Sequence, residues 1–141
     1  MSVKYSIAGL RNPRKSSEPP KYYAKAQASG RLLLESICDN ISHAGSVIRG
    51  DVLAVSDGLI FQMMAGLKEG RIVELGDFGH FQVQVQSKGA DTEKEFTSSN
   101  ITKASIQFRP GKKLVEMLKT LQYQQVSKLP VKVSNGGNEV G

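Results

Sequence analysis

The chain has 141 residues, of which 39% are hydrophobic and 23% are charged, and its formal net charge is +6. This length suits one domain with tails, and the single cysteine, Cys38, excludes an intramolecular disulfide and a multi-cysteine zinc site. Because the N-terminus lacks the apolar segment of a secretory signal and no apolar run approaches membrane-spanning length, we expect a soluble, cytoplasmic protein.

The basic excess lies in the first 31 residues. Seven Lys or Arg residues there accompany one acidic residue, Glu18, which gives +6, whereas the other twelve basic and twelve acidic residues cancel. A basic segment favours a polyanionic partner through counterion release, although a merely soluble basic surface explains the charge equally well. Arg11, Arg14 and Lys15 therefore form a candidate nucleic-acid patch that rests on charge alone.

Residues 1–29 predict a basic extension made of a strand and a loop. Val3, Tyr5 and Ile7 alternate with polar residues, which is typical of a strand, and the prolines of residues 9–21 predict a loop. Residues 22–26 predict a further extended piece. Its two tyrosines lie among lysines and either contact nucleic acid or pack onto the domain, and packing is the favoured alternative.

Two helices are predicted next. Ser29 is the expected N-cap of a helix over about residues 30–44, and Gly45 closes it. A second helix over about residues 50–68 has an apolar stripe too broad for one small sheet to cover, which argues for a partner helix over an ordinary monomer core. The stripe comprises Val52, Leu53, Val55, Leu59, Ile60, Met63, Met64 and Leu67. Gly66 and Gly70 are expected to help end this helix.

Three strands and a last helix follow. Residues 71–75 and 81–86 alternate apolar and polar side chains, a tight turn joins them, and residues 104–108 predict a third strand. Pro110 is expected at the start of a helix with an apolar stripe. The free N–H groups of its first turn, beside Gly111, Lys112 and Lys113, predict an anion site.

Two separated motifs in this region, Leu75-Gly76-Asp77-Phe78-Gly79-His80-Phe81 and Phe108-Arg109-Pro110-Gly111-Lys112, resemble the HU/IHF family of bacterial histone-like DNA-binding proteins. The resemblance covers roughly residues 30–121. It implies an α+β fold with two N-terminal helices, a three-stranded antiparallel sheet with a protruding β-arm, and a C-terminal helix, here with extra terminal strands. It also implies an intertwined homodimer.

The function that this resemblance implies is architectural. The homodimer would bind the backbone of duplex DNA with little sequence specificity and would condense or shape DNA in the nucleoid. The residues at the family's phosphate-contacting positions are Gly76, Gly79, Arg109, Gly111, Lys112 and Lys113, and the basic residues of the arm are Lys88, Lys94 and Lys103. The alternative interpretation of Lys112 and Lys113 is that they are only solvated lysines on an ordinary capped surface helix.

The arm departs from the family pattern. It lacks the proline that wedges between base pairs in the family, and Asp91, Glu93 and Glu95 offset its lysines. Phe96 is the only large apolar residue near the tip, and a folded-back arm would bury it. We therefore expect backbone binding without a deep, kinking grip on the minor groove. A protein-interaction or structural dimer that has lost strong DNA binding is the alternative function.

No enzyme, cofactor, metal site, small-molecule substrate or membrane partner is predicted. Asp77-Phe78-Gly79 matches a kinase triplet, but no Gly-rich phosphate loop accompanies it, and His43 and His80 have no metal-spaced partners. After the last helix, residues 122–128 predict an extra strand, which would pair with the N-terminal one. Residues 129–141 predict a flexible tail.

Overall fold

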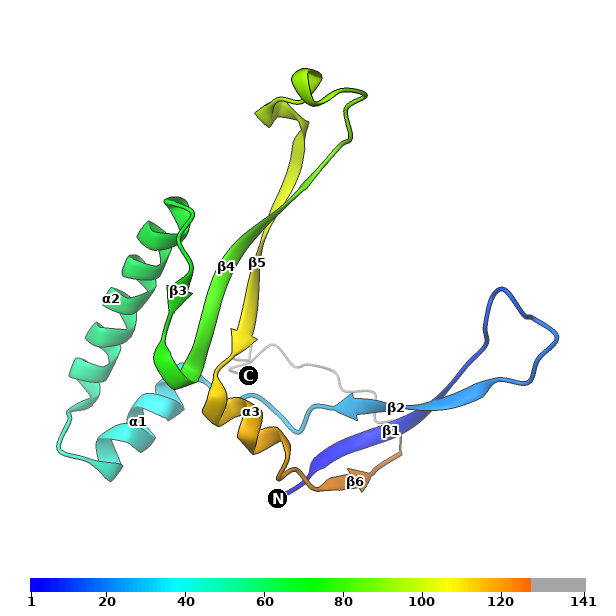
Figure 1. Ribbon diagram of the computed structural model, residues 1–141. Helices are drawn as coiled ribbons and strands as arrows, with labels where there is room; N and C mark the ends of the chain where they lie inside the picture. The colour runs from blue at the N-terminus through cyan, green and yellow to red at the C-terminus, as the bar shows by residue number, and fades with distance from the viewer. Residues whose placement is uncertain (128–141) are drawn as a thin grey trace, which may run out of the picture. The chain divides into compact units, whose positions relative to one another are not determined.

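The computed structural model describes residues 1–127, in which three α-helices and two three-stranded sheets form a mixed α+β architecture (Figure 1). The chain divides into two compact units. One comprises Met1–Leu32 and the chain from Leu121 onward, and the other is Leu33–Thr120. The tail predicted over residues 129–141, and residue 128 of the predicted extra strand, lie outside the described residues.

The first unit is a small sheet in the order β2-β1-β6. β1 (Val3–Leu10) pairs antiparallel with β2 (Lys21–Gln27) and parallel with β6 (Tyr123–Gln125). The Val3 N–H donates to the Gln122 carbonyl at 2.8 Å, and the Val126 N–H donates to the Tyr5 carbonyl at 2.8 Å. The two ends of the described chain are therefore joined through β1.

Helix α1 (Leu34–Ala44) begins later than predicted. Gly30 has φ 135°, which no α-helical residue adopts, so the chain stays extended through Leu33 (φ −80°, ψ 152°). Leu33 is the N-cap and makes no side-chain cap hydrogen bond. The prediction of Ser29 as the cap is therefore wrong, because the glycine next to it breaks the helix.

Helix α2 (Arg49–Lys68) ends in a Schellman motif. Gly70 has φ 76°, its N–H donates to the Leu67 carbonyl at 3.0 Å, and the Arg71 N–H donates to the Gly66 carbonyl at 3.0 Å. Gly70 therefore ends the helix as predicted. Gly66 lies inside the last turns of α2, where its carbonyl accepts the Arg71 N–H of this motif. A Cβ there would come within 3.2 Å of Val73 Cγ2, so this glycine also lets α2 approach the neighbouring strand closely.

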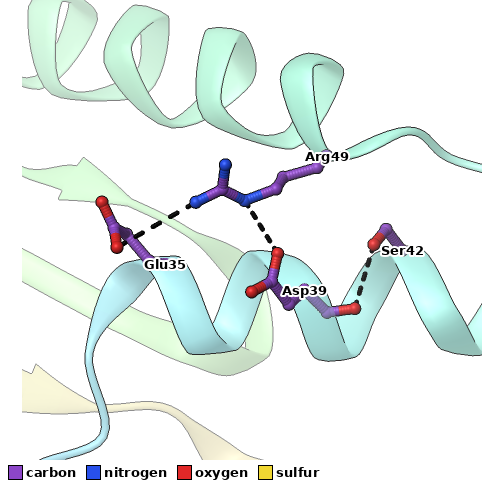
Figure 2. A network of polar contacts seen from close by, with 4 residues as sticks. All are labelled: Glu35, Asp39, Ser42 and Arg49. Atoms are coloured by element: carbon purple, nitrogen blue, oxygen red, sulfur yellow. Dashed lines mark hydrogen bonds and ion pairs between the residues drawn. The ribbon is translucent and has the colours of Figure 1, made fainter.

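An ion pair joins the first turn of α2 to α1 (Figure 2). Arg49 Nε lies 2.7 Å from Asp39 Oδ1, and Arg49 Nη2 lies 4.0 Å from Glu35 Oε2. Ser42 Oγ donates to the Asp39 carbonyl at 2.9 Å. Because all three charged side chains are about half exposed or more, the pair contributes only roughly 0.2–1 kcal/mol to the stability of the fold.

The second sheet has the antiparallel order β3-β4-β5. β3 (Val73–Glu74) is shorter than the predicted strand, whereas β4 (Gly79–Ser87) and β5 (Ile101–Pro110) are longer and run side by side as an arm (Figure 1). Pro110 ends β5 opposite Gly79, and Gly111 is the N-cap of α3 (Lys112–Leu118). The predicted place of Pro110 inside the helix start is therefore wrong, since a strand end tolerates its missing N–H equally well.

The apolar face of this sheet carries α2. Val73, Phe81 and Phe108 lie opposite one another across the three strands, with Val83 opposite Ile106. Gly66 of α2 lies against Val73, so α2 packs on the β3 side of this face, whereas Phe108 and Ile106 of β5 stay 42% and 62% exposed. The Phe81 and Phe108 ring centroids are 4.9 Å apart, and the exposed ring of Phe78 lies against both.

The single chain leaves most of its apolar surface uncovered. Among residues 1–127, Cys38 is the only fully buried apolar side chain, and no residue of α2 is buried. Val55 is 71% exposed and Phe61 is 70% exposed. A helix that is apolar around most of its circumference is normally buried on all sides, so α2 has the composition of a helix that a second protein surface covers.

One described helix, α2, is long and apolar enough by length and composition to cross a membrane. The prediction that no stretch approaches this length is therefore wrong for Arg49–Lys68. Length and composition alone are weak evidence, since a helix buried between protein chains has the same composition. Asp57 near the middle of α2 would be costly in a bilayer.

Candidate nucleic-acid interface

A backbone hydrogen bond joins the turn before β4 to the turn after β5 at the base of the arm. The 3-10 turn η1 (Gly76–Phe78) precedes β4, and the Gly111 N–H donates to the Phe78 carbonyl at 3.0 Å. This contact gathers one set of the predicted site residues in one place: Gly76, Gly79, Arg109, Gly111, Lys112 and Lys113.

Two glycines of this set are required by close backbone packing. A Cβ on Gly79, which has φ 138°, would lie 2.3 Å from the Arg109 carbonyl oxygen. A Cβ on Gly111 would lie 2.3 Å from the Asp77 carbonyl oxygen. Only hydrogen fits at either position, so the motif glycines act by holding the two turns together, and they thereby position the start of α3.

Gly111→Ala is expected to destabilise the fold by about 3 kcal/mol, because the new methyl group must displace the η1 backbone. Thermal or urea unfolding followed by circular dichroism measures this loss. Gly89→Ala is the matched control, since nothing lies within 4 Å of a Cβ there. Equal stability of the two variants would contradict the packing role of Gly111.

The two lysines at the start of α3 differ in their surroundings. Lys113 Nζ lies 3.6 Å from Asp77 Oδ2, and both side chains are exposed, so this pair is weak and can be exchanged for a phosphate. Lys112 has no carboxylate within 4.0 Å in the described part of the chain. Because α3 has only seven residues, its dipole adds little, and the lysine charges dominate any anion binding here.

The face of β4 and β5 opposite α2 is polar, and we call it the glutamine face. Its residues pair directly across the two strands and alternate with the apolar residues that face α2. The Gln84 amide donates to Gln107 Oε1 across the strands. The face comprises His80, Gln82, Gln84, Gln86, Lys103, Ser105, Gln107 and Arg109, with Glu74 beside His80 on β3.

The chemistry of the glutamine face suits a nucleic acid. Glutamine amides and the two cations, Lys103 and Arg109, donate hydrogen bonds to phosphate, sugar and base-edge acceptors. Glu74 is its only carboxylate. The alternation of residues 81–86 predicted a strand but did not single out its glutamines as candidate contacts, although the same pattern places them on one face.

The end of the arm is ordered and slightly acidic, because Asp91, Glu93 and Glu95 outnumber Lys88 and Lys94. Thr92 Oγ1 accepts from the Glu95 N–H at 3.3 Å, and Thr97 and Asn100 form a capping box around the next turn. Lys94 lies between the two glutamates of η2 (Glu93–Glu95), and the Lys88 N–H donates to the Asn100 carbonyl. The arm lysines are thus spread along its length: Lys103 on the glutamine face, Lys88 where β4 ends, Lys94 at the tip.

Phe96 at the arm tip is 41% exposed. The ring is therefore not buried as it would be in a folded-back arm. Its neighbour Glu95 and nearby Glu93 place negative charge beside the ring.

Arg11, Arg14 and Lys15 lie in the other unit, in the loop between β1 and β2. The Arg14 N–H donates to Asn12 Oδ1 at 3.0 Å, and Lys15 Nζ lies 3.4 Å from Glu18 Oε1. The predicted site residues therefore fall into two groups that belong to different units. Within residues 1–127 no group of three or more His, Cys, Asp or Glu side chains could hold a metal ion.

Residues 1–125 match a protein family described as HU-HIG, an HU domain fused to a wHTH, Ig or glycine-rich motif. No curated protein matches the chain. Among solved structures, the chain resembles a candidate bacterial DNA-binding protein from Bacteroides vulgatus, with a TM-score of 0.61 and 16% sequence identity. The match covers 93% of this chain and 51% of the other, so the chain spans about half the length of that protein.

This likeness concerns the fold alone, whereas the family match extends over nearly the whole described chain. It includes both motifs that resemble HU/IHF proteins and the N-terminal sheet. The chain therefore belongs to the HU-HIG family of HU-type domains.

Proposed function

We propose that this protein is a histone-like architectural DNA-binding homodimer that binds the duplex backbone with little sequence specificity. Membership in an HU-type family supports a DNA-binding role. The observation that carries the proposal is the glutamine face, which lies opposite α2 and continues to the lysines at the start of α3. Its groups donate hydrogen bonds and carry positive charge, which suits phosphates more than an apolar ligand.

The proposed homodimer is supported by the apolar side chains of α2 that are exposed in the single chain. A helix with Val55 and Phe61 in water would be unstable and prone to aggregate, and burying each such side chain contributes about 1.5–3 kcal/mol. A second copy offers an equally apolar helix, so two chains can cover one another's stripes around a two-fold axis. The dimer would also double the number of cationic contacts to one duplex.

A salt titration of binding to long duplex DNA tests this function, with the mass measured by sedimentation in the same buffers. The proposal expects a two-chain mass and an affinity that falls steeply with salt, since each neutralised phosphate adds about 0.9 to the slope of log affinity against log salt. Absence of binding at low salt would instead favour a protein-interaction or structural dimer, an alternative supported by the balance of three lysines and three acidic residues over residues 88–103 of the arm.

DNA bound by this protein is expected to bend only slightly. The arm has no proline wedge, and Glu93 and Glu95 beside Phe96 repel the phosphates that line the minor groove. Resonance energy transfer between the ends of a short labelled duplex measures the bend. A sharp bend that Phe96→Ala removes would contradict this expectation and would make Phe96 the wedge, whereas Ser98→Ala at the same tip is the control.

The proposed location follows from the proposed partner. A DNA-condensing protein of this family would act on the bacterial nucleoid in the cytoplasm. Its role would be structural, with no reaction and no cofactor.

A further inference from the structure

Three lysines of the N-terminal sheet lie on one face. In the antiparallel pair β1–β2, Lys4 is opposite Gln27, Ser6 is opposite Lys25, and Leu10 is opposite Lys21. Directly paired residues share a face of a sheet, and residues two apart along a strand share it too. Lys4, Lys21, Lys25 and the intervening Tyr23 therefore form one surface, which we call the cationic sheet face.

The opposite face of the same sheet is apolar. Val3, Tyr5 and Ile7 of β1 lie there, with Tyr22 of β2 and Tyr123 of β6. The two neighbouring tyrosines thus separate, Tyr22 to the apolar face and Tyr23 to the cationic one. Tyr22 and Tyr123 on the apolar face are 71% and 66% exposed, and Lys21, Tyr23 and Lys25 on the other face are exposed as well, so the lysine side is open to a charged partner.

The cationic sheet face is held in a fixed register. Ser6, which is fully buried between the lysines, accepts a hydrogen bond from Gln27 Nε2 at 2.7 Å. Lys4, Lys21 and Lys25 have no carboxylate within 4.0 Å among residues 1–127. Their charges are therefore arranged on a rigid surface and are not neutralised by the protein.

The loop that joins β1 to β2 (Figure 1) carries further basic residues, Arg11, Arg14 and Lys15. Arg11, Lys21 and Tyr23 line a cavity of about 350 Å³ there, together with Glu18. The loop is ordered by successive turns, in which the Asn12 carbonyl accepts from the Lys15 N–H at 3.1 Å. Glu18 is the only acidic residue among the first 31, and it pairs with Lys15. Arg11 and Arg14 therefore have no carboxylate partner within 4.0 Å among residues 1–127.

The lysines have the spacing of an extended polyanion contact. Six residue steps separate Lys21 from the level of Lys4, which is about 20 Å at 3.3 Å per residue. Duplex DNA carries about twelve phosphate charges over that length. Residues 32–141 are neutral overall, so the net charge of +6 that would draw the protein to DNA lies within residues 1–31.

We propose that the cationic sheet face, with Arg11 and Arg14 of its loop, is a second contact to the phosphate backbone of duplex DNA, separate from the glutamine face. This inference rests on the proposed DNA-binding function and adds a surface to it. It places the main electrostatic attraction in the N-terminal hairpin, because the basic excess of the chain lies within residues 1–31, whereas Asp91, Glu93 and Glu95 offset most of the basic charge of the β4–β5 arm.

The test compares two charge-matched variants of the full chain. Lys21→Gln with Lys25→Gln removes two charges from the cationic sheet face, and Lys68→Gln with Lys119→Gln removes two from elsewhere, so each lowers the net charge from +6 to +4. The first variant is expected to bind duplex DNA about tenfold more weakly at moderate salt. Its slope of log affinity against log salt should be smaller by about 2 for each chain that contacts the duplex, because each chain loses two phosphate contacts. The second is expected to bind nearly as the original protein does.

Lysine modification with an amine-reactive reagent gives a second measurement. Duplex DNA should protect Lys21 and Lys25 from modification and leave Lys68 reactive. Equal affinity and slope for the two variants, with binding by the original protein intact, would overturn this inference alone, whereas absence of any DNA binding would remove the proposed function too. Protection by phosphatidylserine vesicles without protection by DNA would assign the face to membranes and would also overturn it.

Discussion

Phe61→Asp is expected to convert the proposed dimer into separate or unfolded chains. Phe61 is 70% exposed in the single chain, on a helix that is apolar around most of its circumference. Losing the burial of one such side chain costs about 1.5–3 kcal/mol, and placing an unpaired carboxylate in an apolar interface costs several kcal/mol more. Because a two-fold dimer contains the change twice, the dissociation constant should rise by at least about 10⁴-fold, at 1.4 kcal/mol per tenfold.

Sedimentation at several protein concentrations measures this change, with circular dichroism to follow the helices. Ser98→Asp is the control, since it adds the same charge at the exposed arm tip, next to a helix-type N-cap that tolerates it. An unchanged two-chain mass for Phe61→Asp would show that α2 is covered in another way. Loss of helix together with loss of the dimer would still support the proposal, because it would mean that the chain folds only as it pairs.

The fold class was predictable from local pattern. Alternation of residues 81–86 and 104–108 predicted the paired strands, and the apolar stripe of residues 50–68 predicted the long helix. These signals work because a strand and a helix repeat their buried side chains at different periods. The two motifs at the base of the arm then predicted the family, and the family match confirms that assignment.

The element ends were less predictable, since they depend on single backbone angles. Ser29 has the side chain of a good cap, yet the φ of 135° at Gly30 keeps the chain extended up to Leu33. Pro110 suits a helix start, but pairing with Gly79 places it at the end of a strand. At Ser29 the local backbone angle of the next glycine outweighs the capping preference, and at Pro110 the tertiary pairing with Gly79 outweighs the preference for a helix start.

The candidate site was predictable only in part. A sequence shows which residues are charged, but it does not show which residues share a face of a sheet. The lysines at the start of α3 were named from the motif. The glutamine face needed the register of β4 with β5, and the separation of Tyr22 from Tyr23 needed the register of β1 with β2. Motif glycines such as Gly79 look like backbone contacts to DNA, whereas the structure gives them a packing role that no side-chain pattern indicates.

Lys112→Glu with Lys113→Glu is expected to weaken DNA binding strongly without unfolding the protein. Both side chains project from the start of α3, and neither is buried, so the fold should tolerate the change. Four lysines of a dimer would lose their phosphate contacts. The slope of log affinity against log salt should then fall by about 3 to 4, and the affinity by at least about 100-fold at moderate salt.

Two further variants separate a specific contact from a general charge effect. Lys68→Glu with Lys119→Glu makes the same change in net charge, from +6 to +2, away from the glutamine face and should cost much less affinity. Lys112→Arg with Lys113→Arg keeps the charge and should bind as the original protein does, because an exposed backbone contact accepts either cation. If both Glu variants lost affinity equally, the start of α3 would hold no particular phosphate, and the attraction would come from net charge and from the N-terminal hairpin.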